Sequence, residues 1–205
     1  MDTALLPDPR EGGLSSELPK ARLEKAVRLL SLEKRKESAG AGLLLARILP
    51  RFLASAEEVF ADERGKLLHP RLYLSLAHGG GMAVLAVGER PVGCDVEKFS
   101  RVREGVLRRF LKEERAFVRE AAGAAGGTTR AREEAFYRIW TGKESYLKMT
   151  GEGLPAWKEV RVLPEGLILR AGKEQPCRIA WKEKGEHLLA VCYEGEAASW
   201  EEVFF

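Results

Sequence analysis

Long apolar segments, paired cysteines and a strong net charge are all missing from this sequence of 205 residues. No apolar run approaches the ~20 residues of a membrane-spanning helix, so no membrane span is expected. The three cysteines, Cys94, Cys177 and Cys192, form neither an even set nor a metal-binding spacing, which argues against a disulfide framework and a structural zinc site. The 34 Lys and Arg residues nearly balance the 31 Asp and Glu residues, so the composition does not favour a nucleic-acid binder.

The start of the chain also lacks the basic segment and apolar core of a signal peptide, so the cytoplasm is the expected location. Residues 1–18 are rich in Pro, Gly and Ser, and they predict a loosely ordered lead-in. The length suffices for one large domain or two small ones.

The first informative motif is the stretch from Pro91 to Glu97. Its residues alternate between an apolar set, Val92, Cys94 and Val96, and a second set, Gly93, Asp95 and Glu97. A period of two predicts a strand with both carboxylates on one face, roughly 6.5–7 Å apart. Carboxylates at that spacing could both bind one hard cation such as Mg²⁺, while Gly93 on the same face leaves room for a bulky neighbour. The simpler reading of such a strand is a solvated edge.

The second motif lies on a predicted helix over residues 131–149. Trp140, Glu144 and Lys148 recur at i, i+4 and i+8, which places them on one stripe of that helix. Glu144 could supply a third oxygen ligand to the cation, and Lys148 could meet phosphate oxygens. The simpler reading is a surface ion pair that contributes about 0.3–0.5 kcal/mol.

Together, the stretches from Gly93 to Glu97 and from Trp140 to Leu154 resemble the 4′-phosphopantetheinyl transferase superfamily, of the monomeric surfactin-synthetase-activating (Sfp) type. The resemblance is clear from about Gly65 to Leu154. It implies an α+β fold, a pseudo-dimer of two similar halves, each with helices packed on a small antiparallel sheet. The halves would be residues 1–100, which carry coenzyme A contacts and the Asp95 and Glu97 strand, and residues 101–205, with the active site at their interface.

The alternating and apolar patterns predict the elements of each half. In the first half, helices at residues 18–32 and 33–52 precede strands at 72–76 and 82–87, and the strand of Asp95 completes a three-stranded antiparallel meander. In the second half, helices at 103–109, 112–122 and 131–149 precede strands at 159–163, 167–170, 177–181 and 187–192.

The resemblance implies transfer of the 4′-phosphopantetheine arm of coenzyme A to a serine of an acyl or peptidyl carrier protein, with release of adenosine 3′,5′-bisphosphate. Mg²⁺, or Mn²⁺ in its place, would be held by Asp95, Glu97 and Glu144, and Asp95, Glu144 and Lys148 would be the catalytic residues. Glu144 would act as the general base, either directly or through a metal-bound water. The implied coenzyme A contacts are Arg22, Lys25, Ser38, Lys66, His78 and Lys148.

Several of these positions depart from the family pattern or have a plainer reading. Leu67 replaces a proline after Lys66, Ala77 replaces a serine before His78, and residues 36–42 lack the His-Arg pair of some members. Arg22 and Lys25 lie on a basic helix face that either binds phosphate or is simply exposed to solvent. Lys34 and Arg35 are candidates for the role of the missing arginine.

The resemblance implies a monomer that binds an acidic carrier protein, and no nucleic acid or membrane. A basic stretch after the metal strand would dock the carrier, through Arg103, Arg108 and Arg109 with Arg101 and Lys112, and Leu107, Phe110 and Leu111 would be apolar anchors. Without the family, the same stretch is a solvated helix. Two alternatives remain: a catalytically silent paralogue that binds coenzyme A or carrier protein, and a different Mg²⁺-dependent phosphotransferase, which the lack of P-loop and kinase signatures disfavours.

Overall fold

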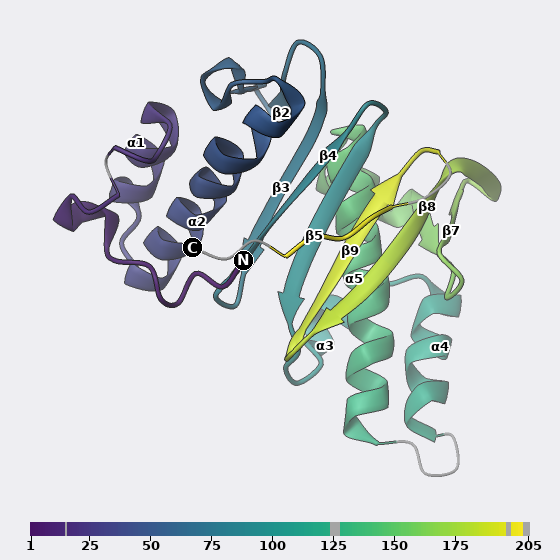
Figure 1. The fold of residues 1–205 in the computed structure, drawn as a ribbon. Helices are drawn as coiled ribbons and strands as arrows, with labels where there is room; N and C mark the ends of the chain where they lie inside the picture. The colour runs from purple at the N-terminus through teal and green to yellow at the C-terminus, as the bar shows by residue number, and fades with distance from the viewer. Residues whose placement is uncertain (15, 124–127, 196–197, 203–205) are drawn as a thin grey trace. The chain divides into compact units, whose positions relative to one another are not determined.

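The computed structural model describes residues 1–14, 16–123, 128–195 and 198–202, and the chain forms two compact units (Figure 1). The first unit comprises Met1–Glu89 with Ser199–Phe205, and the second comprises Arg90–Ala198. Each unit packs helices on an antiparallel sheet, which confirms the predicted α+β class.

The first unit has three layers, in which helix α2 packs on strands β3 and β4 and helix α1 packs on α2 (Figure 1). Its sheet has the order β1-β2-β3-β4, with every neighbouring pair antiparallel. Small residues let the layers approach closely, since a Cβ at Gly42 on α2 would lie 2.7 Å from Leu18 and 3.0 Å from Arg22 Cβ. The elements are η1 (Pro9–Glu11), α1 (Lys20–Arg28), α2 (Leu32–Ile48), η2 (Leu49–Phe52), η3 (Ala56–Glu58), β1 (Phe60–Ala61), β2 (Leu67–Leu68), β3 (Tyr73–Gly79) and β4 (Met82–Gly88).

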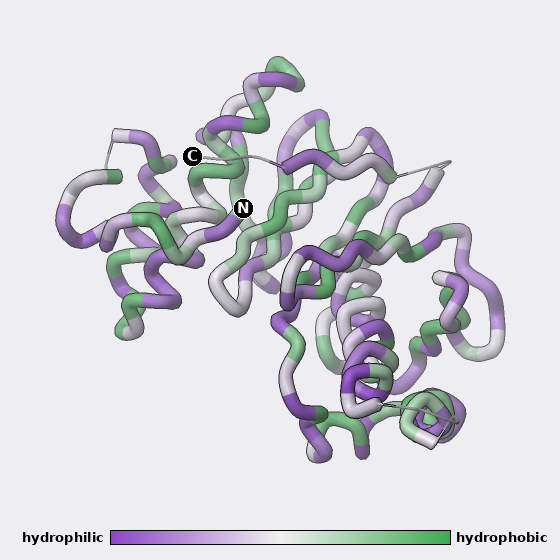
Figure 2. Tube along the Cα trace, turned by 60° about the horizontal axis from the view of Figure 1, so that its bottom comes forward, coloured by the Kyte–Doolittle hydropathy of each residue, from purple (hydrophilic) through white to green (hydrophobic). Residues whose placement is uncertain are grey.

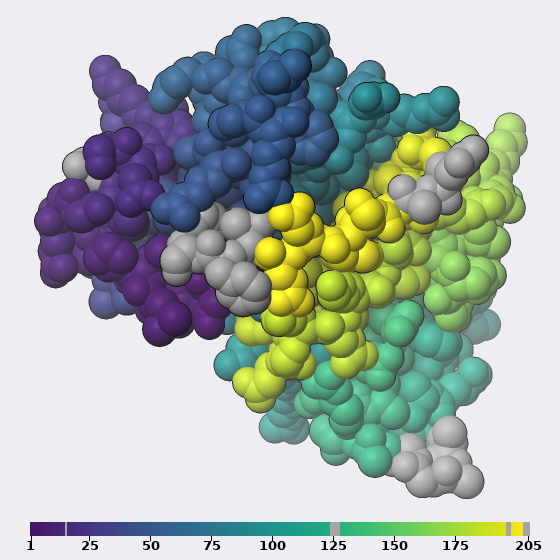
Figure 3. Space-filling model, in the orientation of Figure 1, coloured from purple at the N-terminus to yellow at the C-terminus, as the bar shows by residue number. Residues whose placement is uncertain are grey.

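The first residues of the chain are packed, so the prediction of a loosely ordered lead-in is wrong. The Met1 amino group donates to Ala83 O at 2.9 Å, and Thr3 N donates to Gly81 O at 2.7 Å. Leu6, Leu14 and Leu18 are buried in a cluster with α2. In the space-filling view the purple N-terminal part of the chain forms part of the surface of the first unit (Figure 3). The Pro and Gly content gave no helical or strand period, but scattered leucines supply enough apolar surface to anchor the segment.

The second unit is built around the long helix α5, which covers one face of a five-stranded antiparallel sheet, with α4 packed against α5 (Figure 1). The strand order is β5-β9-β8-β7-β6, so β5 is an edge strand. The Thr128 side chain caps the start of α5, and Gly151 ends it in the left-handed conformation. The elements are β5 (Val92–Lys98), α3 (Glu104–Leu107), α4 (Lys112–Gly123), α5 (Thr129–Thr150), η4 (Leu154–Glu159), β6 (Val160–Val162), β7 (Leu167–Arg170), β8 (Lys173–Lys184) and β9 (His187–Tyr193).

The strand of the two carboxylates belongs to the second unit, and the predicted three-stranded meander of the first half is therefore wrong. Asp95 pairs with Ala190 and Glu97 pairs with Leu188, both on β9, whereas β3 pairs with β2 and β4. The chain passes from the first compact unit to the second between Glu89 and Arg90. A short turn after β4 suggested a local hairpin, but the pairing partner lies some ninety residues further along the chain. The predicted active site at an interface of two halves stays a prediction.

Helix α5 packs on the face of β5 that carries Gly93, Asp95 and Glu97. A Cβ at Gly93 would lie 1.9 Å from Ser145 O and 2.5 Å from Met149 N, so only glycine lets the helix backbone approach this closely. The bulky neighbour expected beside Gly93 is thus α5 itself. No helix in the described part of the chain is long and apolar enough to cross a membrane. Hydrophobic and hydrophilic segments alternate along the Cα trace (Figure 2).

Candidate active site

Strand β5 and helix α5 bring the predicted metal ligands together within the second unit. Lys148 Nζ lies 2.6 Å from Asp95 Oδ1, which forms an ion pair between the two elements. The other oxygen of Asp95, Oδ2, is buried and has no hydrogen-bond partner. An unpartnered buried carboxylate oxygen is costly, so it marks a position where a donor or a cation would be stabilised. We call Asp95, Glu97 and Glu144, with Lys148, the carboxylate cluster.

The electrostatics of Glu144 are those of a group that can exchange a proton near neutral pH. Burial is the main cause, and the negative charges of Asp95 and Glu97 add to it, so that the pKa of Glu144 rises to about 7 although Lys148 opposes the shift. Burial also disfavours the charged form of Lys148, but the carboxylates around it, Asp95 first, outweigh burial and raise the pKa of Lys148. The cluster therefore holds one firmly protonated amine among carboxylates that repel one another.

Glu97 is held by two side chains whose roles the sequence did not reveal. Trp140 Nε1 donates to Glu97 Oε1 at 2.9 Å, and an Arg103 guanidinium nitrogen lies 3.3 Å from the same oxygen. Arg103 also stacks over the Trp140 ring, 4.9 Å from its centroid. The only signal in the sequence was that Trp140 lies one helical turn before Glu144. Arg103 is therefore engaged with the carboxylate cluster, although its side chain remains about half exposed.

The donor set suits a hard cation in kind, but its side chains do not surround one position. Within the described residues, no three His, Cys, Asp or Glu side chains are close enough together to hold a metal ion. Lys148 takes one oxygen of Asp95, and Trp140 with Arg103 takes Glu97. In favour of a cation, the negative charges of Asp95 and Glu97 help to raise the pKa of Glu144, and Asp95 Oδ2 has no partner. Some of these side chains would have to move before all three carboxylates could meet one ion.

A second cluster lies in the first unit, where α1 and α2 bring predicted coenzyme A contacts together. Arg22 Nη2 donates to Ser38 O at 3.4 Å, while Arg22 Nε and the Ser38 hydroxyl are both buried without a hydrogen-bond partner. Burial lowers the pKa of Arg22, and partial desolvation together with the Arg22 charge lowers the pKa of Lys25. Two cations that disfavour each other, beside unsatisfied donors, are an arrangement that an anion would stabilise.

His78, at the end of β3, extends the same group of charges. Its Nδ1 lies 3.4 Å from Glu37 Oε2, and the positive charges of Arg22 and Lys34 act on its ring. Glu37 is fully buried, and the sequence analysis did not identify it as a site residue. The sequence feature that could have indicated it is its position among the small residues of α2, because a charged side chain buried there must have partners. We call Arg22, Lys25, Lys34 and His78, with Glu37 and Ser38, the cationic cluster.

Two other basic residues of the first unit have different surroundings. Arg35 is paired with Asp8 at 2.6 Å and donates to the Leu29 and Leu30 carbonyls, so it fixes the chain before α2 and is not a substitute for a ligand-binding arginine. Lys66 closes the turn that starts at Asp62, and burial lowers the pKa of Lys66.

The predicted carrier-docking stretch is only partly suited to its role. Arg101, Arg108 and Arg109 are exposed. Leu107 and Phe110, expected as apolar anchors, are 4% and 2% exposed and belong to the core of the second unit, so that prediction is wrong. The helix here is a single turn, and its apolar residues pack inward beneath the arginines.

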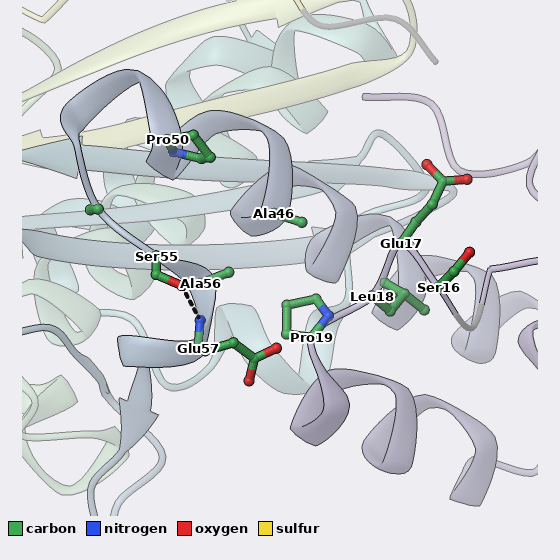
Figure 4. Close-up of a pocket in the computed structure, with 10 residues that line it drawn as sticks. Ser16, Glu17, Leu18, Pro19, Ala46, Pro50, Ser55, Ala56 and Glu57 are labelled. Carbon is green, nitrogen blue, oxygen red and sulfur yellow. Dashed lines mark hydrogen bonds between the residues drawn. The ribbon is translucent and has the colours of Figure 1, made fainter.

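A pocket of about 300 Å³ in the first unit contains none of the predicted site residues (Figure 4). Its ionisable side chains are those of Glu17 and Glu57, which would repel a phosphate. The other lining residues are Ser16, Leu18, Pro19, Ala46, Pro50, Ala54, Ser55 and Ala56.

Comparison with known proteins gives one consistent result. The sequence model of the 4′-phosphopantetheinyl transferase superfamily matches residues 91–192. A 4′-phosphopantetheinyl transferase of Bacillus subtilis is 30% identical over 130 residues, which cover 60% of this chain and 55% of that protein. The 4′-phosphopantetheinyl transferase gsp of Aneurinibacillus migulanus is 24% identical over 87% of this chain and 77% of its own length. The 4′-phosphopantetheinyl transferase HetI of Nostoc is 29% identical over 76% of this chain and 69% of its own length.

The first of these matches spans about half the length of the relative, and the superfamily model covers the part of the chain that holds the whole carboxylate cluster. Through residues 91–192, this chain belongs to the 4′-phosphopantetheinyl transferase superfamily.

Proposed function

We propose that this protein transfers the 4′-phosphopantetheine arm of coenzyme A to a serine of an acyl or peptidyl carrier protein in a Mg²⁺-dependent reaction. The serine oxygen forms a bond to the pantetheine-side phosphorus, the pyrophosphate bond to that phosphorus breaks, and adenosine 3′,5′-bisphosphate leaves. The observation that carries the proposal is the position of Glu144. It lies in a cluster of three carboxylates beside a protonated lysine, and its pKa there is raised to about 7.

The three carboxylates, Glu144 included, would also bind a cation. Asp95, Glu97 and Glu144 would hold Mg²⁺, which supplies neutralisation of the charge that grows on the phosphate oxygens. Lys148 would add a further positive charge, provided that it exchanges Asp95 Oδ1 for a phosphate oxygen. Trp140 and Arg103 would keep Glu97 oriented until the cation binds.

Proton transfer from the serine is the task for which Glu144 is best suited. A general base works best when its pKa is near the operating pH, and burial with two negative neighbours brings Glu144 there. Direct transfer to the carboxylate and transfer through a bound water remain equally open. The cationic cluster of the first unit would bind phosphate of the coenzyme A molecule, through Arg22, Lys25 and His78 with the Ser38 hydroxyl.

Mass spectrometry of candidate apo-carrier proteins tests the proposal. Each carrier is incubated with the protein and coenzyme A, with Mg²⁺ or with excess chelator, and Asp95→Asn serves as the matched variant. A carrier that gains the phosphopantetheine arm only with Mg²⁺ and the unaltered protein supports the proposal. Binding of coenzyme A without transfer to any carrier tested would instead identify a catalytically silent paralogue.

A further inference from the structure

The carboxylate of Glu37 is a buried charge of the first unit to which the proposed reaction assigns no role. It is 0% exposed and lies on α2 with three donors around it. Lys34 Nζ is 2.8 Å from Oε2, Gly81 N donates to Oε1 at 2.9 Å, and His78 Nδ1 is 3.4 Å from Oε2. A buried carboxylate persists only when it is paired and hydrogen-bonded, so this arrangement is built and not incidental.

Glu37 is ionised in spite of its burial. Burial alone would raise its pKa, but the Gly81 N–H and the Lys34 ammonium outweigh that effect, and the pKa of Glu37 is lowered. Because an ionised carboxylate only accepts hydrogen bonds, the ring nitrogen that faces it must carry a proton. His78 therefore has its proton on Nδ1 in the neutral form, and the lone pair of Nε2 lies on the opposite edge of the ring.

The charged groups that act on His78 come from helices α1 and α2. Glu37 and Lys34 face it from α2, and Arg22 faces it from α1. Burial has the largest effect and lowers the pKa of His78; Glu37 raises it, and Arg22 and Lys34 lower it again. The side chain is 27% exposed, so part of the ring is accessible to solvent. At neutral pH the ring is thus mostly neutral, and its remaining site for a proton is Nε2.

We propose that Glu37 is a positioning residue for His78, and that the pair couples anion binding at the cationic cluster to the uptake of one proton. When an anionic oxygen approaches Nε2, the ring takes one proton from solvent and donates Nε2–H to that oxygen, while Glu37 keeps the Nδ1–H bond. No covalent bond other than the N–H bond is formed or broken. The inference rests on the proposed function only in naming phosphate of coenzyme A as the anion.

Glu37 also fixes the turn that follows His78. The same carboxylate accepts from Gly81 N, so the β3–β4 turn and the histidine ring are tied to one group on α2. Gly80 and Gly81 both have positive φ, at 60° and 84°, and the two glycines by themselves restrict the backbone of the turn only weakly. Loss of Glu37 should therefore loosen the ring orientation and the turn together.

The first test compares histidine rings within the unaltered protein, because the chain contains three histidines. Nitrogen-15 NMR of the imidazole rings reports which nitrogen is protonated, with His78→Gln used to assign the signal. His69 is an internal reference for the other tautomer. Its Nδ1 accepts hydrogen bonds from Arg71 N and Leu72 N, so a neutral His69 ring must carry its proton on Nε2. We expect the Nδ1–H form for His78 and the Nε2–H form for His69. An Nε2–H form of His78 in the ligand-free protein would overturn the proposal.

The second test compares Glu37→Gln with Glu33→Gln, an exposed carboxylate one turn earlier on the same helix. Inorganic phosphate and adenosine 3′,5′-bisphosphate are titrated by calorimetry in two buffers of different ionisation enthalpy, which gives the protons taken up. At pH 7.5, after the change in protonation of the ligand itself is subtracted, the unaltered protein and Glu33→Gln should each take up close to one proton. Glu37→Gln should bind about tenfold more weakly, as expected for a histidine pKa lowered by about one unit.

Each outcome bears on the inference independently of carrier modification. Unchanged affinity and proton uptake in Glu37→Gln would overturn it, as would binding by the unaltered protein without proton uptake. If Glu37→Gln fails to fold, the ring tautomer and proton uptake of the unaltered protein still decide the matter. If the expected tautomer and proton uptake are found but no carrier is modified, the inference stands and the proposed function is removed. If a carrier is modified but the expected tautomer and proton uptake are absent, the proposed function stands and the inference is overturned.

Discussion

The two clusters of this protein are electrostatic opposites. In the first unit, one buried carboxylate, Glu37, lies among cations; in the second, one ammonium, Lys148, lies among carboxylates. Both clusters contain polar atoms without partners, Arg22 Nε and the Ser38 hydroxyl in one and Asp95 Oδ2 in the other. The sign of the excess charge therefore indicates the ligand: an anion for the cationic cluster and a cation for the carboxylate cluster.

A third group of charges shows how a purely structural pair differs. Lys143 Nζ lies 2.8 Å from Glu114 Oε2, and the two side chains are 0% and 1% exposed. Glu114 also accepts from Leu111 N and Val162 N, and Lys143 donates to Trp157 O, so both charges are balanced and bonded. A buried ion pair with balanced charges and satisfied hydrogen bonds does not require a ligand. This contrast distinguishes the two candidate binding clusters from an ion pair that only stabilises the fold.

The largest expected effect comes from removal of the carboxylates that are in excess. Asp95→Ala and Glu144→Ala should each reduce transfer by about a thousandfold or more while the fold is kept, because they remove charge stabilisation and the base. Initial rates at saturating Mg²⁺ are the measurement, with the exposed Glu120→Ala on α4 as control. A near-normal rate in either variant would remove the basis for assigning the carboxylate cluster.

Breaking the balanced pair should affect stability instead. Glu114→Ala leaves the Lys143 ammonium buried without its partner, and we expect a loss of about 3–5 kcal/mol in the free energy of unfolding. Urea unfolding measures it. A loss below about 1 kcal/mol would mean that water reaches Lys143 and that this pair is not the structural reference the comparison needs.

Gly93→Ala tests the contact that brings β5 to α5. The added Cβ would meet backbone atoms of Ser145 and Met149, which cannot move without shifting the helix. We expect about 2–3 kcal/mol of destabilisation, as for overpacked core sites. Gly105→Ala in α3 is the matched control, because its Cβ would meet nothing within 4 Å. Equal stability of the two variants would show that β5 and α5 are not in close contact.

The fold elements with a strong local period were predictable, whereas the partners of β5 were not. The alternation from Val92 to Glu97 and the helical stripe of Trp140, Glu144 and Lys148 fall within β5 and α5. The pairing of β5 with β9 depends on residues some ninety positions away, and no local pattern encodes it. The lead-in was misjudged for the related reason that its leucines are scattered and pack only in the tertiary structure.

The candidate site was predictable where residue type alone decides its chemistry. Asp95 and Glu144 stood out because acids on regular elements suit a cation. Glu37, by contrast, has a role only through contacts with Lys34, His78 and Gly81, which the fold brings together. Leu107 and Phe110 look like surface anchors in a basic stretch, and only the packing of the single-turn helix shows that they face the core.

The proton affinity of Glu144 gives a smaller, pH-dependent effect on stability. Its pKa is about 7 in the folded chain and near 4.5 when unfolded, so the folded state binds the proton more tightly and stability falls as pH rises between these values. Glu144→Gln should therefore be more stable than the unaltered protein at pH 8, by about 1–2 kcal/mol after allowance for partial exposure, with little difference at pH 4.5. Urea unfolding at both values checks this. A gap that is larger at pH 4.5 would contradict the burial of an ionised Glu144.

The smallest effect is expected at the exposed arginines after β5. Reversing Arg108 and Arg109 to Glu should raise the Michaelis constant for the carrier protein about fivefold at low salt, with little change for coenzyme A, because exposed charges act mainly on encounter. The defect should shrink as salt rises. Initial rates against carrier concentration at two ionic strengths are the measurement. Unchanged carrier dependence at low salt would show that docking lies elsewhere.

The opposite ligand preferences of the two clusters are tested most directly by a crossed titration of the unaltered protein, Asp95→Asn and His78→Gln. Binding of Mn²⁺, followed by loss of its free paramagnetic signal, reports the carboxylate cluster, and calorimetry with adenosine 3′,5′-bisphosphate reports the cationic cluster. We predict that Asp95→Asn loses about tenfold or more in Mn²⁺ affinity and keeps the nucleotide, and that His78→Gln does the reverse. Normal Mn²⁺ binding by Asp95→Asn, or normal nucleotide binding by His78→Gln, would contradict the assignment of ligands to the two clusters.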